Sequence, residues 1–479
     1  MKINQYFITN DAGVSIDEAD FSKYHVDDFR IFAHKNLKAN QFSKGNNKLV
    51  ILGDIFNPFN PEFSNNIIGN DLIQANALDA LLRSIDKLTG RFVMFVNIDS
   101  SYYVLSDFFG QRQVFYWFDD NHFYASSSSK LVLDTLSLDL EIAESKLTLS
   151  KSNYFLKMHE HWFLGETDWD SRLKKLLPNH FLNINQRTTK RIPMYVSHTS
   201  NKEGLEQEIL LMLKNSIEAY SKRYSLLLGL TSGYDSRLLL ASSIALKRAV
   251  KYFTFNRNDT YVKRDVVIAK QLAKTYNLNH QEIETTNLSQ DFIKEFESQF
   301  IIPRLLDKTK NIQWFRNQKL QDSAVVSGNG GALIRSIYDE ANFKNSASIC
   351  KTIEYEPCEL NLNALDGWLY SARRYANENN LLVSDLFYLE VRLGKWGNKM
   401  AHEMDVSSVE EFTPYNNRYL MCSIILNYNK DERKTITLNL LEQSLEGITA
   451  IPFNPKTWKD TIKKIIFYEY YKKWIQRIK

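Results

Sequence analysis

Glycine and cysteine are both scarce in this chain of 479 residues. Its 17 glycines are roughly half of what a frequency of about 7% would give, so any local cluster of glycines is informative. The three cysteines are Cys350, Cys358 and Cys422. Three is a small and odd number, and it argues against a disulfide framework and against a cysteine-rich zinc site.

The chain also lacks a long apolar run, a signal-peptide pattern and an excess of charge of either sign. No stretch approaches the ~18 apolar residues of a transmembrane helix. The first residues soon reach Asn10 and Asp11 without an apolar segment, so the expected compartment is cytoplasmic. Lysine and arginine number 60 against 56 acidic residues, a net charge of +4. This balance does not indicate a nucleic-acid-binding surface.

Apolar and aromatic residues are plentiful. Hydrophobic residues make up 44% and aromatic residues 13% of the chain, which is enough for more than one core. In the first half, short aromatic and β-branched runs follow one another between residues 92 and 126 without intervening helices. They predict a single antiparallel meander, preceded by a helix over 70–85.

The pattern changes after the polar stretch 197–204, where strand-like and helical runs begin to alternate. Alternation of this kind predicts a doubly wound parallel sheet, and residues from 336 onward are predicted to be mostly helical. The expected fold is therefore α/β and α+β, with one domain over 1–197 and another over 204–479. The strands expected in the parallel sheet are 225–230, 250–255, 280–284 and 324–327.

The turn from Leu230 to Ser236 follows a buried strand and opens a helix. Its hydroxyl groups, backbone N–H groups and helix N-terminus form a site for an anion such as phosphate. Asp235 adds a carboxylate, which is costly beside a phosphate unless a cation lies between them, so Mg²⁺ is implied. The alternative is an ordinary strand-to-helix turn capped by Thr231 or Ser232.

A second turn, from Ser327 to Gly331, concentrates three of the few glycines after another apolar strand. Glycine permits positive φ angles and close approach of a ligand to the backbone. If both strands belong to one parallel sheet, their carboxyl ends face the same crevice. The two turns together favour a nucleotide site.

The sequence Leu-Thr-Ser-Gly-Tyr-Asp-Ser from Leu230 resembles the pyrophosphate loop of ATP pyrophosphatases, and its pairing with Ser-Gly-Asn-Gly-Gly from Ser327 resembles asparagine synthetase-like enzymes. The resemblance implies an N-terminal sandwich of amidotransferase (Ntn) type and a C-terminal ATP pyrophosphatase domain. Further motifs that carry it are 53–57, 88–92, 106–112, 123–127, 177–180 and 410–415.

The chain departs from this family at several positions. Members that use glutamine need an N-terminal cysteine, but position 2 is Lys2 and no cysteine precedes Cys350, so glutamine hydrolysis is not expected. In this respect the first domain is similar to those of β-lactam synthetase and lasso-peptide cyclases. Ala332 stands where the family carries a Mg²⁺-binding aspartate, and Asn329 where it carries a glutamate or tyrosine. These departures leave ATP binding expected and put catalysis in question.

The resemblance assigns roles to individual residues. Lys456 is the candidate for stabilising charge on the adenylate, with Lys459 and Lys434 as rivals. Glu410 either orients substrate or pairs with a neighbouring base, and Asp235 is the candidate metal ligand. The residues expected to bind the nucleotide are Leu230, Thr231, Ser232, Gly233, Asp235, Ser236, Phe255, Ser327, Gly328, Asn329 and Gly330.

The activity implied is glutamine-independent, ATP-dependent amide bond formation through an acyl-adenylate, with ATP and Mg²⁺ as cofactors. The substrate would be the carboxylate of a small molecule, a peptide or a sugar acid, and the second reactant an amine or ammonia. No nucleic acid and no transmembrane segment is expected, and a homodimer is left open. The alternative is a nucleotide-binding scaffold of the same fold that has lost turnover.

Overall fold

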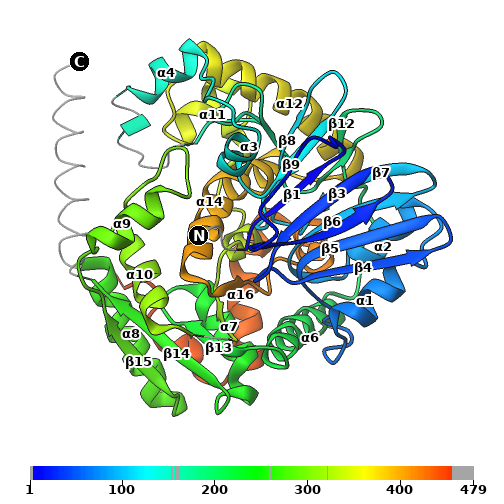
Figure 1. Ribbon diagram of the computed structural model, residues 1–479. Coiled ribbons are helices and arrows are strands. Elements are labelled where there is room, and N and C mark those ends of the chain that lie inside the picture. The colour runs from blue at the N-terminus through cyan, green and yellow to red at the C-terminus, as the bar shows by residue number, and fades with distance from the viewer. Residues whose placement is uncertain (1–3, 153–154, 157–161, 258–259, 321, 456–479) are drawn as a thin grey trace, which may run out of the picture.

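The structure is a computed structural model that describes residues 4–152, 155–156, 162–257, 260–320 and 322–455. The antiparallel strands of the first half lie together on one side of the molecule, and the parallel strands β13, β14 and β15 lie on the other (Figure 1). Among the described helices, none combines the length and the apolar character needed to cross a bilayer.

The first half of the described chain forms two six-stranded antiparallel sheets. The first, in the order β10-β8-β9-β1-β3-β2, consists of β1 (Tyr6–Thr9), β2 (Phe21–Val26), β3 (Phe29–His34), β8 (Phe115–Phe118), β9 (Phe123–Ser126) and β10 (Lys174–Lys175). The second, in the order β12-β11-β7-β6-β5-β4, consists of β4 (Ala39–Lys44), β5 (Asn47–Phe56), β6 (Thr89–Ile98), β7 (Ser101–Ser106), β11 (His180–Asn183) and β12 (Thr188–Arg191).

The two sheets pack face to face with helices on their outer faces. Strand β5 shows how the sequence produces this layering, because its side chains alternate between two cores. Val50 and Leu52 pack between the sheets, whereas Leu49 and Ile51 pack beneath helices α1 (Asn65–Leu72) and α2 (Leu78–Ile85). Helix α3 (Ser129–Thr135) covers the outer face of the first sheet through Leu131 and Val132.

Two details of the first half differ from expectation. The helix expected over 70–85 is interrupted between α1 and α2, where Asn47 donates a hydrogen bond to the carbonyl of Ala75. The expected single meander is divided, because β6 and β7 belong to the second sheet and β8 and β9 to the first. The chain changes sheets at the turn after Asp107, whose buried carboxylate accepts hydrogen bonds from the backbone N–H groups of Gln111 and Arg112.

The second half contains a five-stranded sheet whose neighbouring strands all pair in parallel, in the order β15-β14-β13-β16-β17. The sequence therefore divides antiparallel from parallel structure as predicted. From β13 the chain first adds strands on one side and then returns to the other, so the switch point lies between β13 and β16. The strands are β13 (Ser225–Gly229), β14 (Val250–Asn256), β15 (His280–Glu284), β16 (Ser323–Val326) and β17 (Glu410–Phe412).

Helices surround this sheet and fill the space above it. Those nearest to the sheet are α6 (Lys202–Ser221), α7 (Tyr234–Ser243), α8 (Thr260–Tyr276), α9 (Gln290–Glu297) and α10 (Thr309–Gln318). The later ones are α11 (Ser346–Thr352), α12 (Glu359–Asn379), α13 (Val383–Leu386), the π-helical segment η4 (Phe387–Gly397), α14 (Asn398–Met404), α15 (Arg418–Asn427) and α16 (Lys430–Ser444). Segment η4 continues directly into α14, which lies near the middle of the molecule (Figure 1).

Candidate functional site

A cavity of about 430 Å³ opens at the carboxyl ends of β13, β14 and β16, at the switch point of the parallel sheet. This is where open α/β sheets bind ligands. Of the residues predicted to bind a nucleotide, those that line the cavity are Leu230, Thr231, Gly233, Asp235, Ser236, Phe255, Ser327, Gly328 and Asn329. Ser232 and Gly330 do not line it.

The loop between β13 and α7 is held in shape by its own hydroxyl groups. Thr231 Oγ1 lies 2.8 Å from Ser236 Oγ, and the N–H of Gly233 donates to Thr231 Oγ1 at 3.2 Å. Gly233 precedes the first residue of α7 and has no side chain to cap it. The first backbone N–H groups of the helix are therefore left to a ligand, as in other helix N-termini that bind anions.

Ser232 is turned away from the cavity into the protein. Its backbone N–H and its hydroxyl group both donate to Asp265, at 2.9 and 2.6 Å. Its carbonyl accepts a hydrogen bond from the backbone N–H of Asn454 at 3.1 Å. The polar groups of Ser232 are thus already bound within the protein, and its predicted contact with a nucleotide stays a prediction.

Asp235, the predicted metal ligand, is bound by Arg335. The guanidinium donates to both carboxylate oxygens, one at 3.1 Å and the other in a shorter contact. Burial alone would lower the pKa of Arg335, but Asp235 raises it above its ordinary value. Among the described residues, no group of three or more His, Cys, Asp or Glu side chains could hold a metal ion. These residues do not fit the predicted Mg²⁺ site, because the cation beside Asp235 is a guanidinium.

The glycines of the second loop serve packing more than ligand approach. Gly330 has φ +88°, and a Cβ atom there would lie 2.1 Å from the ring of Phe109 in the first domain. A Cβ atom on Gly331 would lie 2.8 Å from the carboxylate of Asp235. The loop therefore lies between Phe109 of the first half and Asp235. Gly330 does not line the cavity, and its predicted contact with a nucleotide stays a prediction.

Two residues that precede these glycines, Ser327 and Asn329, line the cavity. Asn329 donates a hydrogen bond to Glu411 at 2.7 Å, and both residues line the cavity. Ser327 Oγ is buried and has no hydrogen-bond partner among the described residues. These groups offer polar contacts to a ligand, and the loop that carries Ser327 and Asn329 lies against Asp235 at the start of α7.

The remaining wall of the cavity is largely apolar and was only partly anticipated. Phe255 was predicted, and it packs edge-to-face on Phe315 with ring centres 5.4 Å apart. Sequence reasoning missed the contributors from α10 and α14 because these helices lie far along the chain from Phe255, whereas Phe253 and Val262 lie close to it in sequence. The additional lining residues are Phe253, Val262, Ile312, Phe315, Met400 and Met404, with Arg257, Lys308 and Glu411 among the charged ones.

Glu410, the predicted substrate-orienting residue, lies outside the cavity. Its carboxylate accepts hydrogen bonds from Arg112 at 3.0 and 3.1 Å and from Arg91 at 3.4 Å, both in the first domain. Although burial favours its neutral form, these arginines hold the pKa of Glu410 below its ordinary value. This is the pairing with a base that the sequence left as an alternative. Side chains alternate along β17, so the neighbouring Glu411 faces the cavity instead.

Lys456, the predicted charge-stabilising residue, lies outside the described residues. The preceding segment is described, and it contacts the first loop. Arg237 donates to the carbonyl of Ile451 at 2.6 Å, its guanidinium lies 3.9 Å from the ring centre of Phe453, and that ring stacks on Tyr234. Residues 448–455 therefore support the loop that precedes α7. Of the two rival lysines, Lys434 is exposed and pairs with Asp431 at 2.6 Å, and Lys459 also lies outside the described part.

No protein-family model and no curated protein match the chain. Among solved structures, a glutamine PRPP amidotransferase from B. subtilis, complexed with ADP and GMP, is 12% identical over 70% of this chain and 71% of its own, with a TM-score of 0.24. A glutamine-dependent NAD⁺ synthetase from Acinetobacter baumannii, in complex with ADP, is 14% identical over 43% of this chain and 47% of its own, with a TM-score of 0.20. An NH₃-dependent NAD synthetase from Campylobacter jejuni is 16% identical over 38% of this chain and 85% of its own, with a TM-score of 0.21. Likenesses this distant assign no activity to the chain.

Proposed function

We propose that the cavity at the switch point binds ATP, and that the chain uses ATP to form an amide bond by adenylating a substrate carboxylate. The observation that carries the proposal is the position of the cavity. It lies at the carboxyl ends of β13 and β16, in front of the N-terminus of α7, where a phosphate group meets free backbone N–H groups.

The two sides of the cavity suit the two ends of a nucleotide. The phosphates would lie against the N-terminus of α7, where Thr231 and Ser236 add hydroxyl groups. The base would lie against the apolar wall that includes Phe255 and Phe315. Positive charge in the cavity comes from side chains such as Arg257 and Lys308, and no step is assigned to a metal ion.

In the proposed reaction, a carboxylate oxygen of the substrate attacks the α-phosphorus of ATP, and the bond to pyrophosphate breaks. An amine or ammonia then attacks the acyl carbon, and AMP leaves as the amide forms. The protein contributes mainly by orienting the reactants and excluding water. Glu411 is the carboxylate placed to accept the proton of the attacking amine, because it lines the cavity and one oxygen is fixed by Asn329.

We further propose that the first domain supplies no ammonia. The described cysteines all belong to the second half, where Cys350 and Cys422 are buried. The amine must then come from free ammonia, from a second substrate or from the substrate itself. Glutamate release from glutamine by the purified protein, above a control without enzyme, would contradict this part.

Isothermal calorimetry with ATP, followed by an assay of pyrophosphate release with a panel of carboxylates and amines, tests the proposal. Ser236→Ala should weaken ATP binding about tenfold or more, because the hydroxyl group faces the phosphate side. The matched control is Ser298→Ala, an exposed serine that follows α9, which should leave binding unchanged. ATP binding that is absent, or equal in both variants, would overturn the assignment of this cavity.

A nucleotide-binding scaffold without turnover is the second candidate, and the pairing of Asp235 with Arg335 favours it. Asp235 is already neutralised by the guanidinium of Arg335 and needs no metal ion for that purpose. The asparagine synthetase-like enzymes that the chain resembles use a metal ion in adenylation. Tight ATP binding without pyrophosphate release, for every carboxylate tested, is the result expected of a scaffold.

A further inference from the structure

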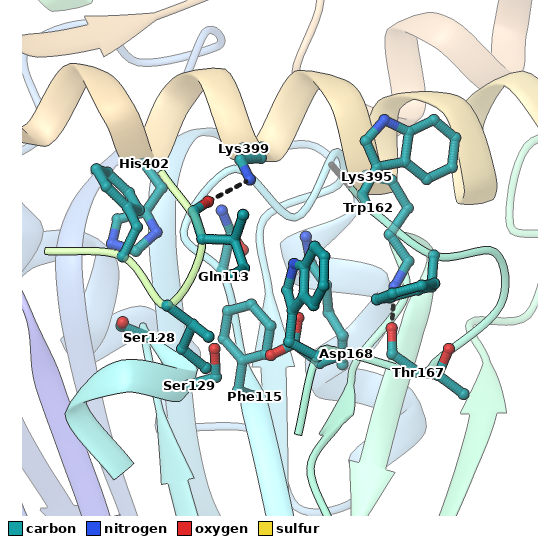
Figure 2. Close-up of a pocket in the computed structure, with 16 residues that line it drawn as sticks. Gln113, Phe115, Ser128, Ser129, Trp162, Thr167, Asp168, Lys395, Lys399 and His402 are labelled. Atoms are coloured by element: carbon teal, nitrogen blue, oxygen red, sulfur yellow. Dashed lines mark hydrogen bonds between the residues drawn. The ribbon is translucent and has the colours of Figure 1, made fainter. Parts of the chain in front are cut away.

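A second cavity, of about 70 Å³, lies between the first sheet and the segment formed by η4 and α14 (Figure 2). We call it the Lys175 cavity, after the lysine of β10 that lines it. Figure 2 shows Lys395 on the helix above the cavity, with Asp168 and Phe115 on the opposite side. Much of the remaining wall is apolar and consists of Phe163, Trp169, Phe300, Ile301 and Ile302.

Strand β10 places Lys175 inside the protein and its neighbour Lys174 outside. It pairs antiparallel with β8, and Lys175 lies opposite Phe115 in that pairing. Because successive side chains of a strand point to opposite faces, Lys175 is only 4% exposed whereas Lys174 is exposed. The backbone N–H of Lys175 donates to the carbonyl of Glu166 at 2.6 Å, which fixes the strand at this point. Two adjacent lysines therefore have opposite environments.

The amino group of Lys175 is free within the described part of the chain. It has no hydrogen bond and no ion pair there, and the centre of the Phe115 ring lies 5.5 Å from Nζ. Lys395 differs in this respect, because it donates to the backbone carbonyl of Thr167 at 2.8 Å. Lys175 thus combines burial, a place in a cavity wall and an amino group that no described residue occupies.

Burial and a neighbouring cation both favour the neutral form of this amino group. Burial first and Lys395 second hold the pKa of Lys175 well below its ordinary value, with a smaller contribution from Lys399, whereas Asp168 acts in the opposite direction. Burial lowers the pKa of Lys395 to about 8, so Lys395 stays largely protonated at pH 7. A lysine that is desolvated or close to another cation is activated as a nucleophile, because more of it carries a free lone pair.

We propose that Lys175 is a nucleophilic lysine that forms an imine with a small carbonyl compound in this cavity. The lone pair of Nζ adds to the carbonyl carbon, the C–O π bond breaks, and a proton moves from nitrogen to oxygen. The resulting carbinolamine loses its hydroxyl group and the remaining proton of nitrogen as water, which leaves a carbon–nitrogen double bond. Amine and carbonyl compound thus give imine and water, without an oxidant or a reductant.

The cavity limits the size of the carbonyl compound and favours one that carries a carboxylate. Its volume of about 70 Å³ exceeds the ~10–15 Å³ that one water requires and falls short of the ~150 Å³ cavity that holds benzene, so the ligand has few heavy atoms. A carboxylate on it would pair with the ammonium group of Lys395, which lines the same cavity. A short 2-oxo acid meets both conditions, and a short aldehyde meets the first.

Reductive labelling of the full chain tests the proposal. The protein is incubated at pH 7 with glyoxylate, pyruvate or acetaldehyde, and cyanoborohydride reduces any imine to a stable secondary amine. Mass spectrometry after digestion by a protease that does not cleave at lysine measures the labelling of each lysine. Lys174 is the internal control, because it is adjacent and exposed.

We expect Lys175 to be labelled about tenfold or more faster than Lys174 at pH 7. An amine whose pKa lies one pH unit lower carries about ten times more of its free form at this pH. The ratio of the two rates should shrink as the pH approaches 10.5, the ordinary pKa of lysine. A higher ratio with glyoxylate and pyruvate would assign a 2-oxo acid, and a higher ratio with acetaldehyde would assign a neutral aldehyde.

Variants locate the reaction. Lys175→Met should abolish the fast labelling, and Lys174→Met should leave it unchanged. Lys395→Met keeps the nucleophile but removes a cation that lowers its pKa, so labelling by acetaldehyde should slow at pH 7 and change less at pH 10.5. A merely structural role of Lys175 would not produce this pH-dependent change. If Lys175→Met does not fold, the rates at Lys175 and Lys174 in the wild type still decide the outcome.

Two results would overturn the proposal. One is labelling of Lys175 that is no faster than labelling of Lys174 at pH 7. The other is equally fast labelling of Lys175 by benzaldehyde, which is too large for the cavity, since the reagents would then reach this lysine in an opened chain. Neither result depends on ATP, so the imine site is tested separately from the proposed function.

Discussion

The interface between the two halves of the chain and the cavity of about 70 Å³ lined by Lys175 and Lys395 both bury positive charges. Carboxylates pair with the charges of the interface, whereas neither of these two lysines has a carboxylate partner within the described part of the chain. At the interface, Arg91 donates to both oxygens of Asp405, at 2.7 and 2.8 Å, and Arg112 donates to Glu410. In the described part of the chain, Lys175 has no such partner, and Lys395 donates a hydrogen bond to the backbone carbonyl of Thr167 at 2.8 Å.

The comparison distinguishes buried charges that stabilise the contact between the two halves from buried charges that have no paired carboxylate in the described part of the chain. Burial alone would lower the pKa of Arg91, but Asp405 and Glu410 hold it above its ordinary value. Burial lowers the pKa of Lys395 to about 8, and no paired carboxylate compensates. Paired charges of the first kind join the two halves of the chain, whereas unpaired buried charges of the second kind lower the stability of the folded protein.

The largest expected effect on stability follows from removing one member of a buried ion pair at the interface. Arg91→Met leaves Asp405 buried without its partner, so the free energy of unfolding should fall by about 3–5 kcal/mol. Denaturation in urea measures it. Arg83→Met, which removes an exposed partner of Asp79, should change stability little, as surface ion pairs do. A loss no larger in Arg91→Met than in Arg83→Met would show that the interface does not depend on this pair.

The burial of Lys395 without a paired carboxylate should make the stability of the protein depend on pH. The pKa of Lys395 is about 8 in the folded chain against 10.5 ordinarily, so the unfolded state binds more protons between these values. Stability contributed by this group therefore rises as pH increases from about 8 to about 10.5.

The measurement is the difference in free energy of unfolding between wild type and Lys395→Met across that range. Wild type should gain relative to the variant by up to about 3 kcal/mol. Lys395 faces Asp168, Glu166 and Lys146, and these groups are common to both proteins, so their titration largely cancels. A difference that does not change with pH would mean that the pKa of Lys395 is the same in the folded and unfolded chain, as it would be if a partner kept its ammonium group charged.

A smaller effect is expected for Asp235, a paired charge that lines the cavity at the switch point of the parallel sheet. Arg335→Gln frees the carboxylate of Asp235, which can then take part in binding Mg²⁺. ATP binding by the wild type should be insensitive to Mg²⁺, whereas binding by the variant should tighten by about tenfold when Mg²⁺ is added. Calorimetry with Mg²⁺ and with a chelator provides the comparison, and Arg374→Gln, an exposed arginine of α12, is the control. Strong Mg²⁺ dependence in the wild type would show that the guanidinium does not replace the metal.

Local sequence predicted much of the second half. The apolar runs and the turn after Leu230 predicted β13, α7 and a site between them. Such predictions are possible because residues close in sequence largely determine a strand, a turn and a helix. The roles of Asp235 and Glu410 could not be predicted in this way. Their partners, Arg335 and Arg112, lie 100 and 298 positions away, and only the folded chain brings them together.

The first half shows the same limit at the level of sheets. Short alternating runs correctly indicated antiparallel strands, but not that β8 and β9 leave the sheet of β6 and β7. That choice depends on the turn held by Asp107, whose carboxylate also accepts a hydrogen bond from Asn416 at 2.8 Å. A contact with the second half of the chain thus fixes a turn in the first half, which no local pattern encodes.

The support that residues 448–455 give to the first loop has a consequence for synthesis on the ribosome. Ser232 leaves the ribosome 222 positions ahead of Asn454, the residue that binds it. Domains fold in the order in which they are made, so the parallel sheet can form while the loop between β13 and α7 still lacks this support. Before residues 448–455 have been made, Arg237 would lie in an apolar environment. It would then lack the carbonyl groups of Ile448 and Ile451, which accept its hydrogen bonds in the folded chain. The loop between β13 and α7 is therefore among the last parts of the described chain to reach its final form.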